Sequence, residues 1–164
     1  MICIIPARKN SKELKNKNIL KINKKPLIDY TVLAAKKSAK IKKIYISTDD
    51  EKIINYYKKD PKVQIPFKRP RFLSTDKASS LDVYMHMIKH LEQKKINIRD
   101  FCVLLPTCPV RNYKHIDEAI NIYKKKKLKY LISVVKTDPL EWHFNINKKN
   151  LMKRINNLTF SINN

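Results

Sequence analysis

Cationic side chains gather directly after the first apolar run of the sequence. Residues 2–5 form this run, and residues 6–18 follow it with Arg8, Lys12 and Lys17 among further lysines. Arg can bind phosphate oxygens through two parallel hydrogen bonds, and Lys adds a compact charge on a mobile stem. After the carboxyl end of a strand, such a segment predicts a phosphate-binding loop. A solvated, lysine-rich connector is an equally supported interpretation, because loops are usually polar.

Short apolar runs rich in β-branched residues predict the central strands. They are continuous rather than alternating, as strands covered on both faces are. The runs are residues 2–5, 44–46, 101–105 and 131–135. Helical patterns lie between them, at residues 26–39, 51–57, 80–94 and 115–126. This alternation predicts an α/β fold with a mostly parallel sheet, whose ligand site lies at the carboxyl ends of the strands.

Length and composition favour one soluble domain. The chain has 164 residues and 43% hydrophobic residues, and no apolar run approaches the roughly 20 residues that span a bilayer. We therefore expect a single domain over residues 1–164 and no membrane partner. Three cysteines without Cys-x-x-Cys spacing, and no visible export signal, predict a cytoplasmic location.

The formal net charge of +23 raises the hypothesis of a polyanionic partner. Only 6 of the 37 basic residues are Arg, and no aromatic-basic signature or recognition motif accompanies the charge. A nucleic-acid partner is therefore the less favoured hypothesis. The lysine run at residues 124–127 falls in the last turn of a predicted helix, where it is interpreted as a solvated helix end.

Glycine is absent from the sequence, whereas average usage predicts about eleven. Each turn that needs a positive φ must then use Asn or Asp, or be reshaped at some cost in strain.

Five segments occur in a characteristic order between residues 4 and 111. They read "IPARKNSKELKNKNI", "KPLIDYTV", "IYISTDDEKI", "KRPRFLSTDKASSLDV" and "LLPTCPVR". Together they resemble the nonulosonate cytidylyltransferases, the family of the CMP-N-acylneuraminate (CMP-sialic acid) synthetases and of related enzymes for legionaminate and pseudaminate. The resemblance implies a Rossmann-like, three-layer α/β sandwich of the nucleotide-diphospho-sugar transferase type.

The resemblance also implies an activity. Members of this family join CTP to a nine-carbon α-keto acid sugar and release pyrophosphate with the help of magnesium. Attack of the anomeric hydroxyl on the α-phosphorus leaves positioning and charge neutralisation as the main tasks of the protein. We therefore expect an enzyme of the N-acylneuraminate cytidylyltransferase type. An inactive CTP-binding fragment and a basic nucleic-acid-binding α/β protein are the alternatives.

Matching positions in the motifs implies a role for each candidate residue. The triphosphate would be held by catalytic cations, which are Arg8, Lys12 and Lys17. The nucleotide would be recognised by Arg8, Asn18, Arg69 and Ser80. Arg111, in "PTCPVR", belongs to the motif near the sugar. These types fit the task, because a cytosine edge and ribose hydroxyls need neutral groups whereas a triphosphate needs permanent cations.

Other polar residues have plainer interpretations. Asp49 is expected to cap the helix at residues 51–57 rather than bind a ligand, and Asp76 to cap or brace its loop. His86 and His90 lie four residues apart on a predicted helix, one turn after Asp82, but no third ligand pattern supports a metal site. We expect both histidines to be ordinary exposed residues.

The chain departs from the family pattern at several positions. Asn10 and Lys24 stand where relatives usually have glycine, Leu105 where many have glutamine, and Cys108 where many have serine, as a small packing residue. The family's aspartate pair that binds magnesium has no counterpart, so no metal ligand is assigned. We expect a chain that is truncated at its C-terminus and that is poorly stable and weakly active by itself, and we expect a homodimer when the protein is full length.

Overall fold

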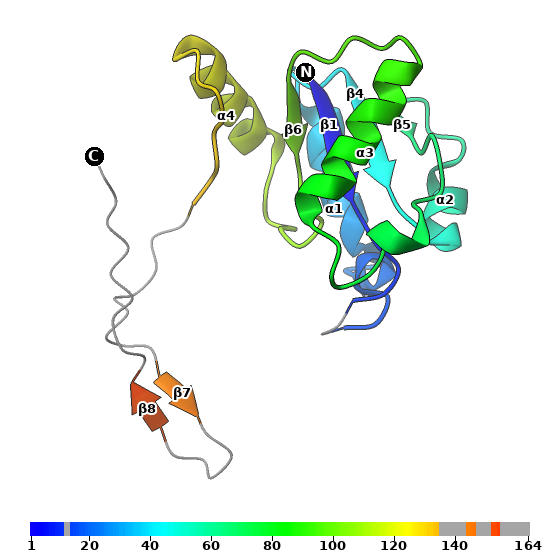
Figure 1. Cartoon of the computed structure of the whole chain (residues 1–164). Helices are drawn as coiled ribbons and strands as arrows, with labels where there is room; N and C mark the ends of the chain where they lie inside the picture. The colour runs from blue at the N-terminus through cyan, green and yellow to red at the C-terminus, as the bar shows by residue number, and fades with distance from the viewer. Residues whose placement is uncertain (12–13, 135–143, 147–151, 155–164) are drawn as a thin grey trace. The chain divides into compact units, whose positions relative to one another are not determined.

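A parallel β-sheet forms the centre of the structure, a computed structural model that describes residues 1–11, 14–134, 144–146 and 152–154. The sheet has four strands in the order β5-β4-β1-β6, all parallel (Figure 1). The strands are β1 (Ile2–Pro6), β4 (Lys43–Ser47), β5 (Val63–Gln64) and β6 (Phe101–Val103). Ile2 lies opposite both Lys43 and Phe101 in register. The predicted parallel α/β sheet is confirmed.

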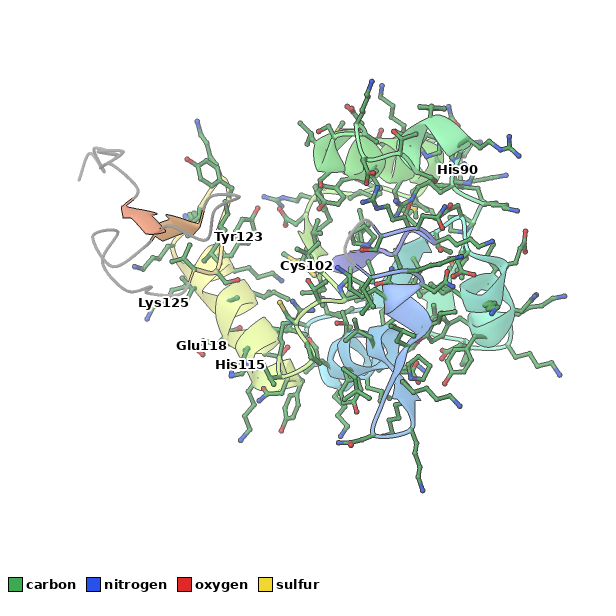
Figure 2. The ribbon with its side chains drawn as sticks, turned by 90° about the horizontal axis from the view of Figure 1, so that it is seen from below. His90, Cys102, His115, Glu118, Tyr123 and Lys125 are labelled. Carbon is green, nitrogen blue, oxygen red and sulfur yellow. The ribbon has the colours of Figure 1, made fainter. Side chains whose placement is uncertain are left out.

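Helices cover both faces of this sheet. Viewed along the sheet, α3 lies on one side and α1 on the other (Figure 2). The helices are α1 (Leu27–Lys37), α2 (Glu51–Tyr57), α3 (Ser80–Gln93) and α4 (Tyr113–Lys125), with the 3-10 turns η1 (Lys17–Ile19) and η2 (Arg71–Leu73). Two antiparallel hairpins complete the described elements: β2 (Lys21–Ile22) with β3 (Lys25–Pro26), and β7 (Phe144–Ile146) with β8 (Met152–Arg154). The three-layer sandwich is confirmed.

Strand β1 is buried on both faces because its side chains alternate between two cores. Cys3 and Ile5 pack in the cluster that includes Ile28 and Val32 of α1. Ile4 packs in a second cluster with residues of α3, namely Met87, Ile88 and Leu91. Full burial of an aliphatic side chain contributes about 1.5–3 kcal/mol, so these contacts hold β1 firmly in the centre.

The described contacts divide the chain into two units, Met1–Tyr130 and Leu131–Asn164. The expectation of a single domain over residues 1–164 stays a prediction. The expected strand at residues 131–135 is wrong for residues 131–134, which form no strand. Ile132 and Val134 are 76% and 90% exposed. Apolar β-branched residues form a strand only where neighbouring main chains bond to them, and residues 131–134 pair with none in the described part. Val135 lies outside the described residues.

Local side-chain contacts shift several predicted boundaries. Helix α4 begins at Tyr113, because Asn112 accepts the backbone N–H groups of Lys114 and His115. The His115 ring accepts the N–H of Asn112 in return, which completes a capping box. Figure 2 labels His115 and Lys125 near the two ends of this helix. The prediction of a solvated, lysine-rich helix end at residues 124–127 is confirmed, because all four lysines are exposed. No described helix is long and apolar enough to cross a membrane.

Positive φ angles occur in the described chain despite the lack of glycine. They belong to Asn16, Asn23, Lys24, Lys95 and Lys127. Asn23 and Lys24, at φ 46° and 66°, form the two-residue turn of the β2-β3 hairpin. Two successive positive φ angles match a type I′ turn, for which Asn-Gly is the preferred pair. The strain expected at Lys24 is therefore located in a hairpin.

Replacing Lys24 with glycine should stabilise the protein. Lys24→Gly creates the preferred Asn-Gly turn and removes a left-handed lysine, so we expect the free energy of unfolding to rise by about 0.5–1 kcal/mol. Urea denaturation measures this change. Lys25→Gly is the matched control, since Lys25 lies in strand β3 and should lose stability. Equal changes in the free energy of unfolding for the two substitutions would contradict the interpretation that the backbone is strained at Lys24.

Candidate functional site

The site predicted by the sheet topology lies at the carboxyl ends of β1, β4 and β6. Strand order along the sheet reverses at β1, because β4 and β5 lie on one side of it and β6 on the other. Parallel α/β sheets bind ligands in the crevice at such a reversal. The segments that leave these ends begin at residues 7, 48 and 104.

Arg69 is buried at the end of β4 and is 5% exposed. Its Nε donates to Oγ of Ser47 over 3.0 Å, and its Nη2 donates to the Ser47 carbonyl oxygen. Its backbone N–H donates to the carbonyl of Thr48 over 2.7 Å. Burial lowers the pKa of Arg69 to about 10, with Asp49 opposing this shift and the charge of Arg8 adding to it. Arg69 therefore remains a cation at neutral pH.

Backbone contacts on both sides fix the loop that carries Arg8. The N–H of Ala7 donates to the Ser47 carbonyl over 2.9 Å, and the N–H of Lys9 donates to Oδ1 of Asp49 over 2.8 Å. The side-chain amide of Asn18 donates to the carbonyl of Arg8 over 3.0 Å. Arg8 and Asn18, predicted to act together, are thus in direct contact.

Asp49 and Asp76, the carboxylates near the carboxyl ends of β1 and β4, each bind a group of the protein itself. The prediction that Asp49 caps α2 is wrong, because Asp50 is the cap and accepts the N–H of Lys52 over 2.9 Å. Asp49 lies one residue too early for that role and binds the Arg8 loop instead. Asp76 pairs with Arg8, with 2.5 Å between Oδ1 and Nη2. Asp76 thus links its turn to the Arg8 loop and does not cap α3, which Ser79 caps.

The remaining candidates share no described contact with Arg8 or Arg69. Lys12 lies outside the described residues. Lys17 opens the turn η1 and is half-buried. Ser80 begins α3 and is exposed, whereas Ser79 caps this helix. Nη2 of Arg111 donates to the carbonyl of Leu105 over 2.8 Å and contacts Oγ1 of Thr31 at 3.1 Å, so Arg111 ties the segment after β6 to α1.

Sequence reasoning missed two residues that position these cations. Ser47 supplies both acceptors of the Arg69 guanidinium. No sequence signal identifies it, because a serine at a strand end has many uses. Thr31 is fully buried among the apolar residues of α1 and contacts Arg111. Its position on the apolar face of a predicted helix was a usable signal, since buried hydroxyls need partners.

Two histidines on α3 enclose an aromatic ring. The rings of His86 and His90 lie edge-on to Phe67, at centroid distances of 4.6 and 4.8 Å. Both histidines are half-buried, so the expectation of ordinary exposure is wrong. Burial, followed by the charges of His90 and Arg69, lowers the pKa of His86.

Within the described residues no group of three His, Cys, Asp or Glu side chains could hold a metal ion. Cys108, expected to pack, is exposed.

These observations define a parallel α/β protein with two arginines, Arg8 and Arg69, at the carboxyl ends of its strands. Residues 2–160 match the model of a family described as Cytidylyltransferase. The chain therefore belongs to the cytidylyltransferase family, as its five motifs predict.

Named relatives agree with this membership. The chain is 38% identical to an N-acylneuraminate cytidylyltransferase of Escherichia coli, over 84% of this chain and 32% of that protein. It is 33% identical to a pseudaminic acid cytidylyltransferase of Campylobacter jejuni, over 91% and 64% of the two chains. It is 31% identical to a CMP-N,N'-diacetyllegionaminic acid synthase of Legionella pneumophila, over 76% and 53%. The chain thus spans between about a third and two thirds of these relatives.

A solved structure supports the fold. The chain is similar to a CMP:2-keto-3-deoxy-manno-octonic acid synthetase complexed with CTP, with a TM-score of 0.61 and 19% identity. The likeness covers 77% of this chain and 48% of that one. At this identity the comparison establishes the α/β architecture.

Removing the Arg69 guanidinium should destabilise the protein at the carboxyl end of β4. Arg69→Leu leaves the Ser47 carbonyl and hydroxyl without these donors, so we expect the free energy of unfolding to fall by about 2–3 kcal/mol. Urea denaturation measures the loss. Arg71→Leu replaces an exposed neighbour, and its effect should stay within about 0.5 kcal/mol. Equal stability of the two variants would contradict the stabilising role of the contacts between Arg69 and Ser47.

The pKa of His86 predicts a pH dependence of stability. His86 resists protonation in the folded state, whereas an unfolded histidine gains a proton as the pH falls through about 6.5. Stability should therefore be lost as the pH falls from 7.5 to 5.5, and His86→Gln should weaken this dependence. Thermal unfolding at several pH values measures it, with the unaltered chain as the reference. An unchanged pH dependence of stability in His86→Gln would contradict the lowered pKa of His86.

Proposed function

We propose that this chain forms the nucleotide-binding part of an enzyme that transfers CMP from CTP to a sialic-acid-like nine-carbon sugar. The observation that carries the proposal is the anchored Arg8 loop beside the buried cation Arg69. Relatives named for N-acylneuraminate, pseudaminic acid and legionaminic acid support this sugar class. The solved relative with CTP supports the nucleotide.

The proposed reaction needs charge neutralisation near the phosphates. The anomeric hydroxyl of the sugar would attack the α-phosphorus of CTP and lose its proton to water. The bond from the α-phosphorus to the oxygen that bridges it to the β-phosphorus would break, and pyrophosphate would leave. Arg8 is half-exposed at the carboxyl end of β1, where it could neutralise the charge of the leaving phosphates. Lys17 and Lys12 would contribute as further cations of the same loop.

The other candidates have roles that follow from their free hydrogen-bonding groups. Asn18 uses one amide hydrogen on Arg8, so its other hydrogen and its oxygen could bind ribose or cytosine. Arg69 uses two donor groups on Ser47, which makes it first a positioning residue, with its remaining donors and Ser80 as nucleotide contacts. Arg111 would act on the sugar side through the main chain at Leu105.

Magnesium enters the proposal only as an ion that accompanies the nucleotide. Mg²⁺ is commonly bound by one or two carboxylates together with substrate phosphates. Asp49 holds the N–H of Lys9 and Asp76 pairs with Arg8, so these carboxylates do not fit a protein-held metal site. The described residues thus assign no step to the metal. A homodimer rests on the resemblance alone, and a cytoplasmic location rests on the cysteine spacing of the sequence.

Selective binding of CTP tests the nucleotide. In a thermal-shift assay the chain should be stabilised by CTP more than by ATP, whereas duplex DNA should not compete. Arg8→Gln removes a charge-assisted phosphate contact and should weaken CTP binding by roughly 10- to 100-fold. Lys125→Gln removes an exposed charge at the end of α4 and should leave binding unchanged. Equal stabilisation by CTP and ATP would reject a cytidine-specific site, and salt-sensitive stabilisation by DNA would favour a nucleic-acid function.

Release of pyrophosphate from CTP in the presence of a nonulosonate separates an enzyme from an inactive CTP-binding fragment. CTP binding without turnover, under conditions in which the Campylobacter jejuni relative releases pyrophosphate, would favour the inactive alternative.

A further inference from the structure

Arg8, the cation that the proposed function assigns to phosphate, is paired with Asp76 in this structure. Nη2 of Arg8 and Oδ1 of Asp76 are 2.5 Å apart, and their side chains are 30% and 44% exposed. A carboxylate and a phosphate offer the same kind of acceptor oxygen to a guanidinium. Asp76 therefore binds where a phosphate oxygen would bind.

The two partners of this pair are anchored very differently. The main chain around Arg8 is held by Asn18 and, through Lys9, by Asp49. Asp76 lies in an exposed turn over residues 75–78, whose backbone contact is Ala78 N–H to Thr75 carbonyl at 3.4 Å. The Thr75 hydroxyl adds a second long hydrogen bond, to the Phe72 carbonyl at 3.4 Å. An exposed turn held by two long hydrogen bonds opens more easily than a loop fixed on both sides. When the pair separates, Asp76 should move and Arg8 should stay.

The charges around Arg8 favour a multivalent anion over the single charge of the Asp76 carboxylate. Arg69 keeps a positive charge near Arg8 and is bonded to the neutral acceptors of Ser47. Asp76 on Arg8 and Asp49 near Arg69 each bring a single negative charge to these cations, whereas a triphosphate brings several. Exposed ion pairs are weak, so a multivalent anion can displace Asp76.

We infer that Asp76 is a displaceable internal counter-ion, which holds the Arg8 side chain toward the crevice and leaves it when a polyphosphate binds. This inference rests on the proposed function in one respect, the binding of phosphate by Arg8. Asp76 is a positioning residue that acts through Arg8, and it sets a threshold against weakly charged anions.

A double-mutant cycle on the full 164-residue chain tests the inference. Calorimetry would measure the Kd of CTP and of inorganic tripolyphosphate for the unaltered chain, Asp76→Asn, Arg8→Gln and the double variant. Asp76→Asn should bind both ligands about two- to fivefold more tightly, the range expected for loss of an exposed competing pair. In the Arg8→Gln background the same substitution should have little effect, because its partner is gone.

Two controls separate the pair from a general effect of charge. Glu51→Gln removes the same charge and breaks another exposed ion pair, that with Lys68, and it should not change either Kd. Asp76→Glu keeps the carboxylate and should bind like the unaltered chain. Unchanged or weaker binding by Asp76→Asn, or an equal gain in the Arg8→Gln background, would overturn the inference.

The two ligands distinguish this inference from the proposed function. A chain that binds tripolyphosphate with the expected cycle but does not prefer CTP to ATP would contradict the cytidylyltransferase proposal alone. A chain that prefers CTP but shows no gain in Asp76→Asn would contradict the role of Asp76 alone. Binding of neither ligand would reject both.

Discussion

Hydrogen bonding at Ser47 is the constraint on which the geometry of the crevice depends. Its carbonyl oxygen accepts from Ala7 at the end of β1 and from the Arg69 guanidinium, so both of its lone pairs are used. The Ser47 hydroxyl accepts from Nε of Arg69 as well. Two residues further along, Asp49 accepts the N–H of Lys9. The last residues of β4 therefore fix the course of the chain after β1 and the place of the buried cation, and a change in one of these contacts must disturb the others.

The two arginines of the crevice differ in the charge of their partners. Arg69 is bonded to the neutral oxygens of Ser47, so its positive charge is only partly offset by the nearby Asp49. Arg8 is paired with a carboxylate, which balances its charge. Most of the net charge of +23 comes from lysines, and exposed charges are screened beyond about 8 Å at physiological ionic strength. Local pairing, rather than the total charge, decides how the crevice interacts with an anion.

Much of the fold was predictable because its signals are local or periodic. The strands at residues 2–5 and 44–46 follow from continuous β-branched runs, and α3 follows from its apolar spacing. The run at residues 131–135 carries the same signal, but residues 131–134 pair with no strand in the described part, and sequence cannot supply a partner. In the site, motif positions indicated Arg8 and Asn18, which do touch. The choice of Asp50 over Asp49 as helix cap depends on a one-residue difference in backbone geometry that composition does not encode.

Residues 14–20 form a defined turn without the help of glycine. Asn16 adopts the left-handed conformation at φ 57°, directly before the turn η1, and asparagine tolerates this region better than most residues. The turn is closed by main-chain bonds from Lys17 to Leu14 and from Ile19 to Asn16, and neither bond requires a special side chain. Asn10, which stands where relatives usually have glycine, has no positive φ. Strain is instead left to lysines outside this segment, namely Lys24 in a hairpin, Lys95 after α3 and Lys127 after α4. The absence of glycine is therefore compatible with the anchored loop, because the lysine positions where its loss is costly do not shape the loop.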